Sequence, residues 1–315
     1  MPQYAAFRLN VQANNLFLVG DIGLVVDARL FQFLRRTLEQ NRGCRIFYVM
    51  GNHEPYQITL EQAHKSLRDF EQDAKENFGG RFKFLCRDRY DLDKTITILG
   101  CTLWSAIQRS QESDIASRST DLNSERGIRN WTLERHEDEH RKDLGWLNSQ
   151  ISTIERDEPH RQVIIATHYS PTIDPRANDP RHDGSSVSSN FVTDLSNERC
   201  WLSPMVKLWV FGHTHYSCSF CDEKTGKLVV ANQKGYSRVG ARGTQAGMKA
   251  KVVEAGEVWA VVKIRRSSGE EHIQAVDARI EEQVVSGNRG KTNVQTPKDP
   301  LLLRMTKRMR SLCGS

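Results

Sequence analysis

The sequence predicts an α/β fold built on parallel strands. Four short apolar runs, rich in Val, Ile, Leu and Phe, each stop at a residue that can bind a metal ion; the runs are 16–19, 46–50, 163–166 and 208–211. Continuous apolar runs of this length are typical of strands buried on both faces. Because parallel strands expose their carboxyl ends at one edge of a sheet, we expect the residues that follow the four runs to meet there.

Helical periodicity links the first two runs and continues after the second. The segment 28–42 carries Leu30, Phe31, Leu34 and Leu38 at helical spacing, which predicts a crossover helix between parallel strands. A second amphipathic helix is predicted from an apolar face formed by Leu60, Ala63, Leu67, Phe70 and Ala74.

The middle of the chain changes character. The β-branched and aromatic stretches 82–86 and 95–104 flank a polar turn at 87–94, which predicts a strand pair and a shift to a second or mixed sheet. A polar segment, 106–131, precedes a helix marked by Leu144, Leu147, Ile151 and Ile154. The Pro- and Ser-rich stretch 174–189 is predicted to be a long loop at the ligand edge of the sheet. Further strands are predicted at 252–253 and 258–264.

Composition limits the class of protein. The 315 residues are 38% hydrophobic and 27% charged, as in a soluble globular protein, and no apolar run approaches the ~18 residues of a membrane span. The first sixteen residues have no secretory h-region. Seven scattered cysteines fit a reducing compartment, so we expect a cytoplasmic protein. Cys218 and Cys221 form a Cys-x-x-Cys, interpreted either as ordinary thiols or as a redox or metal pair.

The net charge of +6 comes from the end of the chain. Residues 288–315 hold seven Lys or Arg and one Asp, which leaves residues 1–287 formally neutral. We therefore expect no nucleic-acid partner. The apolar residues of this tail allow two interpretations: a basic amphipathic helix that contacts an anionic membrane, or a solvated tail.

The ligand motifs become informative when they are taken in order. They are Gly20-Asp21, Gly51-Asn52-His53-Glu54, Thr167-His168 and Gly212-His213-Thr214-His215. This series, each member directly after an apolar strand, resembles the calcineurin-like metallophosphoesterase superfamily. The resemblance covers about residues 16–236, and 229–236 is similar to the closing strand and turn of that family.

The resemblance implies a fold and a metal site. The fold is a four-layer α/β/β/α sandwich with two mixed β-sheets flanked by helices, expected over residues 1–240, with 241–315 as a partly disordered basic extension. Two divalent ions such as Mn, Fe or Zn are implied. Asp21 corresponds to the bridging ligand, Asn52, His168 and His213 to ligands of the second ion, and His215 to a ligand of the first.

The resemblance also implies the reaction. A metal-activated hydroxide attacks the phosphorus of a phosphorylated substrate, and His53 donates a proton to the departing oxygen. The protein is therefore expected to be a hydrolase of phosphoric esters. Of the histidines outside the motifs, His182 in the loop 174–189 is a candidate phosphate contact, whereas His64, His136, His140, His160 and His272 are predicted to lie on the surface.

Two departures from the family pattern qualify this expectation. The family begins with an Asp-x-His that supplies two ligands to the first ion, and nothing before Asp21 provides it, so the second site is expected to be intact and the first weak. Either the strand with this triplet has been lost from the start of the chain or the chain is a degenerate member. Asp138-Glu139-His140 spells the triplet out of order and is interpreted as solvated surface.

The second departure is Leu24, which stands where many members have an Asp that orients the catalytic histidine. These departures leave an alternative open: a catalytically weak or inactive family member that acts as a protein-binding module. Nucleic-acid processing uses the same two-metal chemistry, but the first 287 residues lack a basic groove signature.

Overall fold

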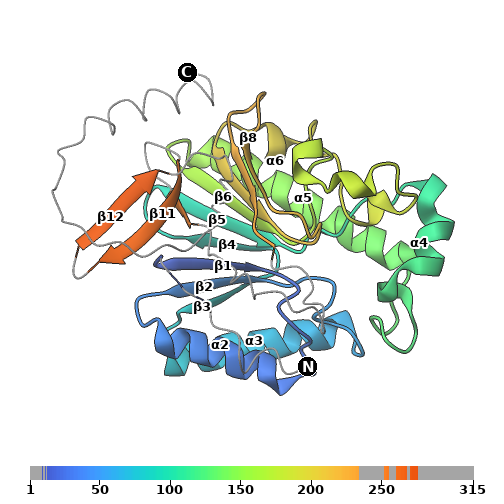
Figure 1. Cartoon of the computed structure of the whole chain (residues 1–315), viewed down its shortest axis with the longest axis horizontal. Helices are drawn as coiled ribbons and strands as arrows, with labels where there is room; N and C mark the ends of the chain where they lie inside the picture. The colour runs from blue at the N-terminus through green and yellow to red at the C-terminus, as the bar shows by residue number, and fades with distance from the viewer. Residues whose placement is uncertain are drawn as a thin grey trace, which may run out of the picture.

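Two β-sheets stacked face to face, with helices on both outer faces, form the body of the molecule (Figure 1). The structure is a computed structural model that describes residues 9, 11 and 13–233, together with the backbone of 252–254, 260–267 and 270–275. The basic tail 288–315, His272's side chain and Lys234-Gly235-Tyr236 of the closing turn lie outside the described residues. No helix in the described part of the chain is long and apolar enough to cross a membrane.

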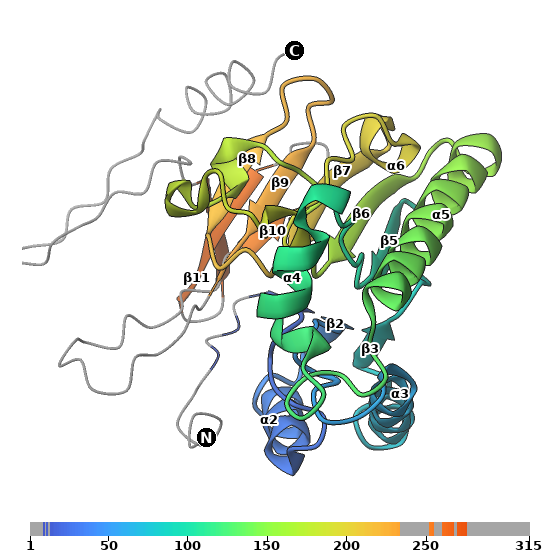
Figure 2. The same ribbon diagram turned by 90° about the vertical axis from the view of Figure 1, so that its right-hand side faces the viewer.

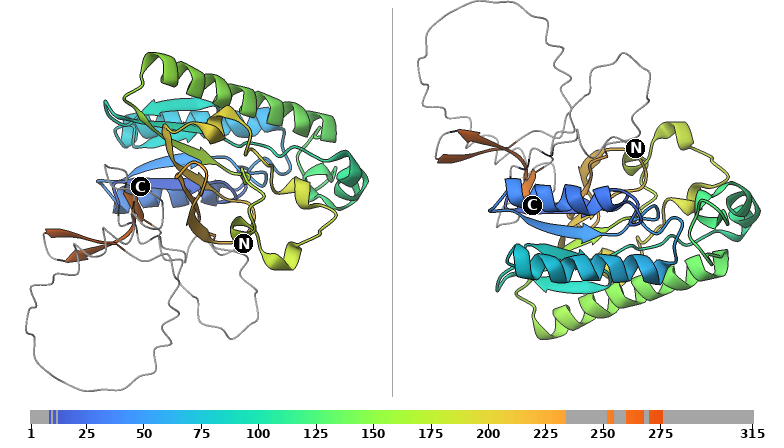
Figure 3. Two further views of the ribbon diagram at one scale, coloured as in Figure 1. Left: turned by 90° about the horizontal axis from the view of Figure 1, so that it is seen from above. Right: turned by 90° about the horizontal axis from the view of Figure 1, so that it is seen from below.

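The smaller sheet contains β1 (Asn15–Val19), β2 (Arg45–Val49) and β3 (Phe82–Leu85), all parallel. Helices α2 (Ala28–Gln40) and α3 (Leu60–Asn77) connect these strands and lie side by side on the outer face of the sheet (Figures 1 and 3). The buried residues of α3 are the predicted face of Leu60, Ala63, Leu67, Phe70 and Ala74. Thr59 caps α3 in a capping box with Gln62, which fixes where the helix begins.

The larger sheet is mixed, with the order β4-β5-β6-β7-β9-β8. Its strands β5 (Ile96–Cys101), β6 (Gln162–Thr167), β7 (Val206–Phe211) and β9 (Leu228–Ala231) run parallel. The edge strands β4 (Asp88–Asp91) and β8 (Cys218–Cys221) are antiparallel to their neighbours. The long helix α5 (Leu133–Asp157) and the short α6 (Arg199–Leu202) cover the outer face (Figure 3).

Three apolar layers hold the four structural layers together. One lies between α2, α3 and the smaller sheet and contains Leu34, Leu67 and Phe82. The middle layer joins the two sheets through residues such as Phe47 and Ile164. The third lies under α5 and contains Leu147, Ile151 and Trp209, among others. The architecture is the predicted α/β/β/α sandwich, with the difference that the smaller sheet is all parallel where a mixed sheet was expected.

One predicted pairing is wrong. The stretches 82–86 and 95–104 do not pair with each other: β3 joins β2 in the smaller sheet, while β5 joins β6 in the larger one. The supposed polar turn contains β4, whose residues Asp88–Asp91 pair antiparallel with β5. Alternating polar residues hide this edge strand, but the predicted change of sheet does occur at this point.

Two long excursions leave the larger sheet on the side that Figure 2 faces. The first arm, residues 106–131, contains α4 (Glu112–Arg118) and two 3-10 turns, Arg109–Gln111 and Thr120–Leu122. The second arm, residues 171–199, contains the 3-10 turns Pro175–Ala177, Pro180–His182 and Ser188–Asn190. A separate antiparallel sheet is formed by β10 (Val252–Glu254), β11 (Ala260–Ser267) and β12 (Glu270–Ala275).

Candidate metal centre

Four of the five predicted ligand residues meet where strands of the two sheets end. Asp21 and Asn52 follow β1 and β2, while His168 and His213 follow β6 and β7. The Nε2 atom of His168 lies 3.0 Å from Oδ1 of Asn52, 3.1 Å from Nδ1 of His213 and 3.4 Å from Oδ1 of Asp21. Stacking of the sheets thus brings ligand atoms of Asp21 and His213, 192 positions apart in sequence, within 4.8 Å of each other.

The outer hydrogen bonds of both histidines assign their protons. His168 Nδ1 lies 2.7 Å from the carbonyl oxygen of Val19, and His213 Nε2 lies 3.2 Å from that of Asn190. Because a carbonyl oxygen only accepts, these two nitrogens carry the protons. The inner nitrogens, His168 Nε2 and His213 Nδ1, therefore present lone pairs to the centre of the group.

Asn52 is oriented by a residue of the first arm. Its Nδ2 donates to Oδ1 of buried Asp121 at 2.8 Å, so its Oδ1 must point toward His168. Tyr56 donates to the same Asp121 oxygen at 2.6 Å. Burial raises the pKa of Asp121, while the hydrogen bonds from Tyr56 and Asn52 oppose that rise. Sequence analysis did not identify Asp121, because it stands in a polar segment with no ligand motif.

The four inner atoms of this group all carry lone pairs, and none of them carries a proton. Two imidazole nitrogens, one amide oxygen and one carboxylate oxygen face one another with no hydrogen between them. Burial lowers the pKa of His213 well below its usual value, which disfavours a proton at this position. One carboxylate, one amide oxygen and two imidazoles suit borderline divalent cations such as Mn, Fe or Zn. The residues present therefore fit a metal ion, and the inner atoms of Asp21, His168 and His213 all lie within 4.8 Å of one another.

The backbone around Asp21 is tightly constrained. Gly20 has φ +87°, and a Cβ there would collide with His168 and with the backbone of Gly51. Glu54 is fully buried and accepts hydrogen bonds from the backbone N–H groups of Asp21, Ile22 and Gly51 at 2.8–3.0 Å. Its carboxylate therefore holds the turn that aims Asp21 at the centre, a role that the sequence did not assign to it.

Asp21 and His213 also adopt left-handed φ values of 56° and 65°. Such conformations cost roughly 1–3 kcal/mol in residues other than glycine and are found where the surrounding structure imposes them, often at functional sites. The pKa of Asp21 is lowered: burial opposes its charge, but the imidazoles of His168, His53 and His213 and the His53 N–H outweigh burial.

His53 lies beside the group without joining it. Its backbone N–H donates to Oδ1 of Asp21 at 3.1 Å, and its Nδ1 is 3.9 Å from Oδ2. The ring lies 4.7 Å from that of Tyr56, tilted by 33°, and faces the pocket with 31% of its side chain exposed. Leu24 packs against the apolar layer under α2 and α3 and supplies no carboxylate to His53.

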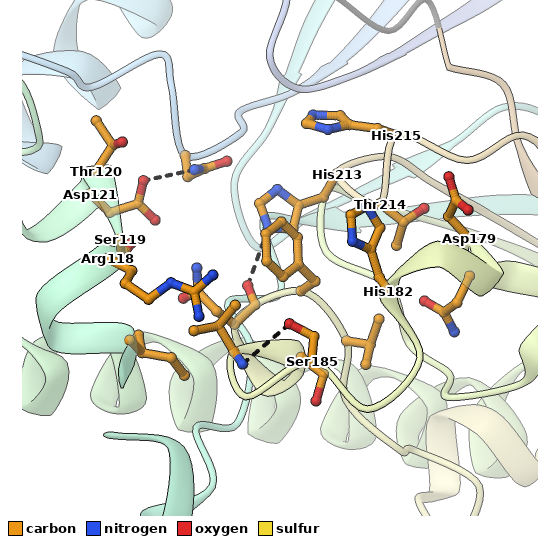
Figure 4. A pocket seen from close by; sticks show the side chains of 18 of the residues that line it. Arg118, Ser119, Thr120, Asp121, Asp179, His182, Ser185, His213, Thr214 and His215 are labelled. Atoms are coloured by element: carbon orange, nitrogen blue, oxygen red, sulfur yellow. Dashed lines mark hydrogen bonds between the residues drawn. The ribbon is translucent and has the colours of Figure 1, made fainter. Parts of the chain in front are cut away.

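His215 lines the same pocket, on the loop that also carries His213 (Figure 4). It is not among the residues whose ligand atoms lie within 4.8 Å of one another. Burial lowers its pKa. The charge of the Asp21 carboxylate opposes this lowering of the His215 pKa.

Aromatic rings support the histidines from below. Tyr169 packs 4.1 Å from the ring of His213, and Trp104 and His136 pack on Tyr169 at 5.4 and 5.8 Å. His136 is 2% exposed and 3.0 Å from Oγ of Ser105. This stack fixes the plane of the metal-facing imidazole.

Sequence analysis predicted that His136 and the Asp138-Glu139-His140 triplet lie on the solvated surface. This prediction is wrong for three of the four residues. His136, Glu139 and His140 are buried, because the charged face of α5 packs against the chain instead of facing water. Arg87 reaches Glu139 at 3.0 Å and Asp143 at 2.6 Å. The triplet lies outside the ligand group.

The Cys-x-x-Cys pair is not a compact dithiol. Cys218 and Cys221 begin and end β8, and residues three apart in a strand point to opposite faces. Cys218 packs in the apolar layer under α5, and Cys221 packs in the layer between the sheets.

The four-residue group opens into a pocket of about 580 Å³ bounded by both arms (Figure 4). The first arm contributes Ile115, Arg118 and residues 119–121, and the second contributes 173–192 in part. His182 lies on this wall, as does Ser185. A cavity of this size is in the range that binds small organic ligands.

Several known proteins are similar to this chain in sequence or in structure. A sequence model of the family described as calcineurin-like phosphoesterase matches residues 4–217. An uncharacterized protein of Acanthamoeba polyphaga mimivirus is 30% identical over 233 residues, which cover 70% of this chain and 78% of that protein. Among solved structures, the phosphopantetheinyl hydrolase of Mycobacterium tuberculosis is similar over 74% of this chain and 83% of its own, with a TM-score of 0.49 and 13% identity.

Proposed function

The chain belongs to the calcineurin-like phosphoesterase family, and we propose that it hydrolyses phosphoric esters in a metal-dependent reaction. The observation that carries the proposal is the convergence of four lone pairs from Asp21, Asn52, His168 and His213 on one point. Such a group is unfavourable by itself and becomes favourable when it shares a cation.

These four residues would hold one divalent cation firmly. Asp21 and His215 would contribute to a second, weaker site. Bound cations supply Lewis acidity, which activates water and stabilises the negative charge that develops on phosphoryl oxygens. The chain's own contribution is to fix the ligands before the cation arrives, through Val19, Asn190 and Asp121.

His53 is the candidate proton donor. It is held beside Asp21 through its own backbone N–H and through the ring of Tyr56, and its imidazole is accessible from the pocket. From this position it can deliver a proton to the oxygen of a departing alcohol.

The alternative is a family member that binds a partner without catalysis. The weaker site favours this alternative, because Asp21 and His215 are the only ligands that the sequence comparison assigns to it. Both functions require the cation held by the four-residue group, and they differ only in whether the protein turns over a phosphoester.

The test is a calorimetric Mn²⁺ titration of metal-free full-length protein together with an assay on p-nitrophenyl phosphate. We expect one tight site, hydrolysis that chelation abolishes and Mn²⁺ restores, and a loss of affinity of roughly a hundredfold or more in Asp21→Asn. Asp69→Asn on the exposed face of α3 is the matched control and should bind Mn²⁺ like the wild type.

The outcomes separate the two functions. Tight binding without turnover on any phosphoester would favour the binding module. Unchanged Mn²⁺ affinity in Asp21→Asn would show that the four-residue group is not the metal site.

A further inference from the structure

The two arms are joined to each other along one side of the pocket. Gln111 of the first arm accepts from the backbone N–H of Ser189 at 2.8 Å and donates to Oγ of Ser188 at 3.0 Å. Arg118 at the end of α4 donates to Oγ of Ser186 at 3.2 Å. These bonds make the arms one continuous wall, so the pocket above the metal-facing group has a defined width and depth.

Part of this wall is apolar, and one of its apolar side chains is exposed. Ile173 lines the pocket although 57% of it is exposed, and buried Ile115 faces it from the first arm. Phe191 also lines the pocket and stacks on the ring of His213 at 4.8 Å. An exposed large apolar side chain inside a concave site indicates contact with an apolar part of a ligand.

The wall also carries one fixed cation. Arg118 is the only Lys or Arg among the described residues that line the pocket, and its side chain extends from α4 into the cavity (Figure 4). The carboxylates of the outer wall are Asp179 and Asp183 on the second arm, and Asp179 is already paired with Arg181. A planar guanidinium at the end of a cavity is suited to a carboxylate or phosphate group.

We propose that the substrate is a small phosphoester whose organic part is apolar and carries a second anionic group, which Arg118 binds. The inference rests on the proposed function, because the metal-facing group must hold the phosphate that reacts. The apolar part then lies between Ile115 and Ile173, and the second anion reaches Arg118. The site is a pocket and not an open groove, because hydrogen bonds join the two arms at 111–118 and 185–189. A pocket of this kind favours a small molecule over a phosphoprotein segment.

The test measures binding, so that it does not depend on turnover. Full-length protein loaded with Mn²⁺ is titrated by calorimetry with phenylphosphonate and with 4-phosphonobenzoate, which adds one carboxylate. We expect the wild type to bind 4-phosphonobenzoate about tenfold more tightly, the value of one charge-assisted hydrogen bond. In Arg118→Ala the two dissociation constants should become equal, and Arg118→Lys should keep part of the preference.

Arg126→Ala is the matched control, since Arg126 is an exposed arginine of the first arm outside the pocket, and it should keep the full tenfold preference. Mn²⁺ affinity, measured in each variant, shows that the site has folded. A preference that survives in Arg118→Ala, or that is absent from the wild type, overturns this inference alone. Tighter binding of a phosphoserine peptide than of either phosphonate also overturns it. Failure of both phosphonates to bind the Mn²⁺-loaded protein overturns the proposed function as well.

Discussion

The floor of the pocket and its walls are built in opposite ways. The floor, Asp21, Asn52, His168 and His213, sits at strand ends, and the outward-facing atoms of Asn52, His168 and His213 each have a hydrogen-bond partner. The walls are the two arms, whose polar residues bond to other arm residues, as Arg181 does with Asp179 and Gln111 with Ser189. The floor is therefore preorganised for one chemistry, whereas the walls can change with the substrate at little cost to the fold.

The largest effect on rate is expected for His53. It tests whether this residue donates a proton or only supports the floor of the pocket. In Mn²⁺-loaded protein, His53→Ala should slow an alkyl phosphate by ~10² to 10⁴, because a poor leaving group needs a proton as it departs. p-Nitrophenyl phosphate should be slowed far less, since p-nitrophenolate leaves as an anion. Rates on both substrates and the Mn²⁺ content give the measurement.

Exposed His160 provides the control, and His160→Ala should keep both rates. Equal losses on the two substrates, or loss of Mn²⁺, would mean that His53 supports the floor and does not donate the proton.

The second prediction concerns the aromatic stack beneath the floor. Burial lowers the pKa of His136 from its usual 6.5 to about 3, with the neighbouring His140 adding to the effect. Between these values the unfolded chain binds a proton that the folded chain does not, so stability falls as pH falls from 6.5 toward 3. His136→Phe should remove this slope, worth about 2–3 kcal/mol of unfolding free energy between pH 6 and pH 4.

Urea denaturation at several pH values measures the slope. The relevant quantity is the difference between the wild type and His136→Phe in how the unfolding free energy changes with pH. Loss of the contact with Ser105 lowers the unfolding free energy by the same amount at every pH and so leaves this difference unchanged. Parallel curves for the two proteins would mean that His136 is protonated in the folded state.

Asp121 belongs to the first arm and thus to the wall, but it orients Asn52, which is a residue of the floor. In Asp121→Asn the new amide can face the Nδ2 of Asn52, which would favour rotation of Asn52 and turn its oxygen away from the metal. Mn²⁺ affinity should fall by about 10- to 100-fold, as is typical when a partner of a ligand is lost. Calorimetry with Asp69→Asn as control measures it, and an unchanged affinity would confine Asp121 to a structural role in the arm.

The smallest effect is expected on the wall itself. Ile173→Ala removes apolar area from a half-exposed side chain, worth about 1 kcal/mol, so phenylphosphonate should bind roughly fivefold more weakly. Methylphosphonate, which is too small to reach the wall, should bind as before. A similar loss for both ligands would place Ile173 among the residues that shape the floor.

Much of the fold could be predicted because its signals are local. Apolar runs of four or five residues define β1, β2, β6 and β7, and the spacing of Leu60, Ala63, Leu67, Phe70 and Ala74 gives the buried face of α3. The pairing of β3 with β2 and of β5 with β6 was not accessible in this way. Either partner satisfies the same alternation of residues, and only the packing of whole sheets selects one of them.

The sequence by itself determined which residues stand at strand ends: Asp21, Asn52, His53, His168, His213 and His215 all follow apolar runs directly. The tertiary structure decided which of these touch, because a left-handed turn at Asp21 and the stacking of two sheets set distances that no spacing encodes. It also brought in Asp121, 69 positions from Asn52, and buried Glu139 and His140 on a helix face whose charge suggested water. Burial depends on what packs against a residue, and the partner here, Arg87, is distant in the chain.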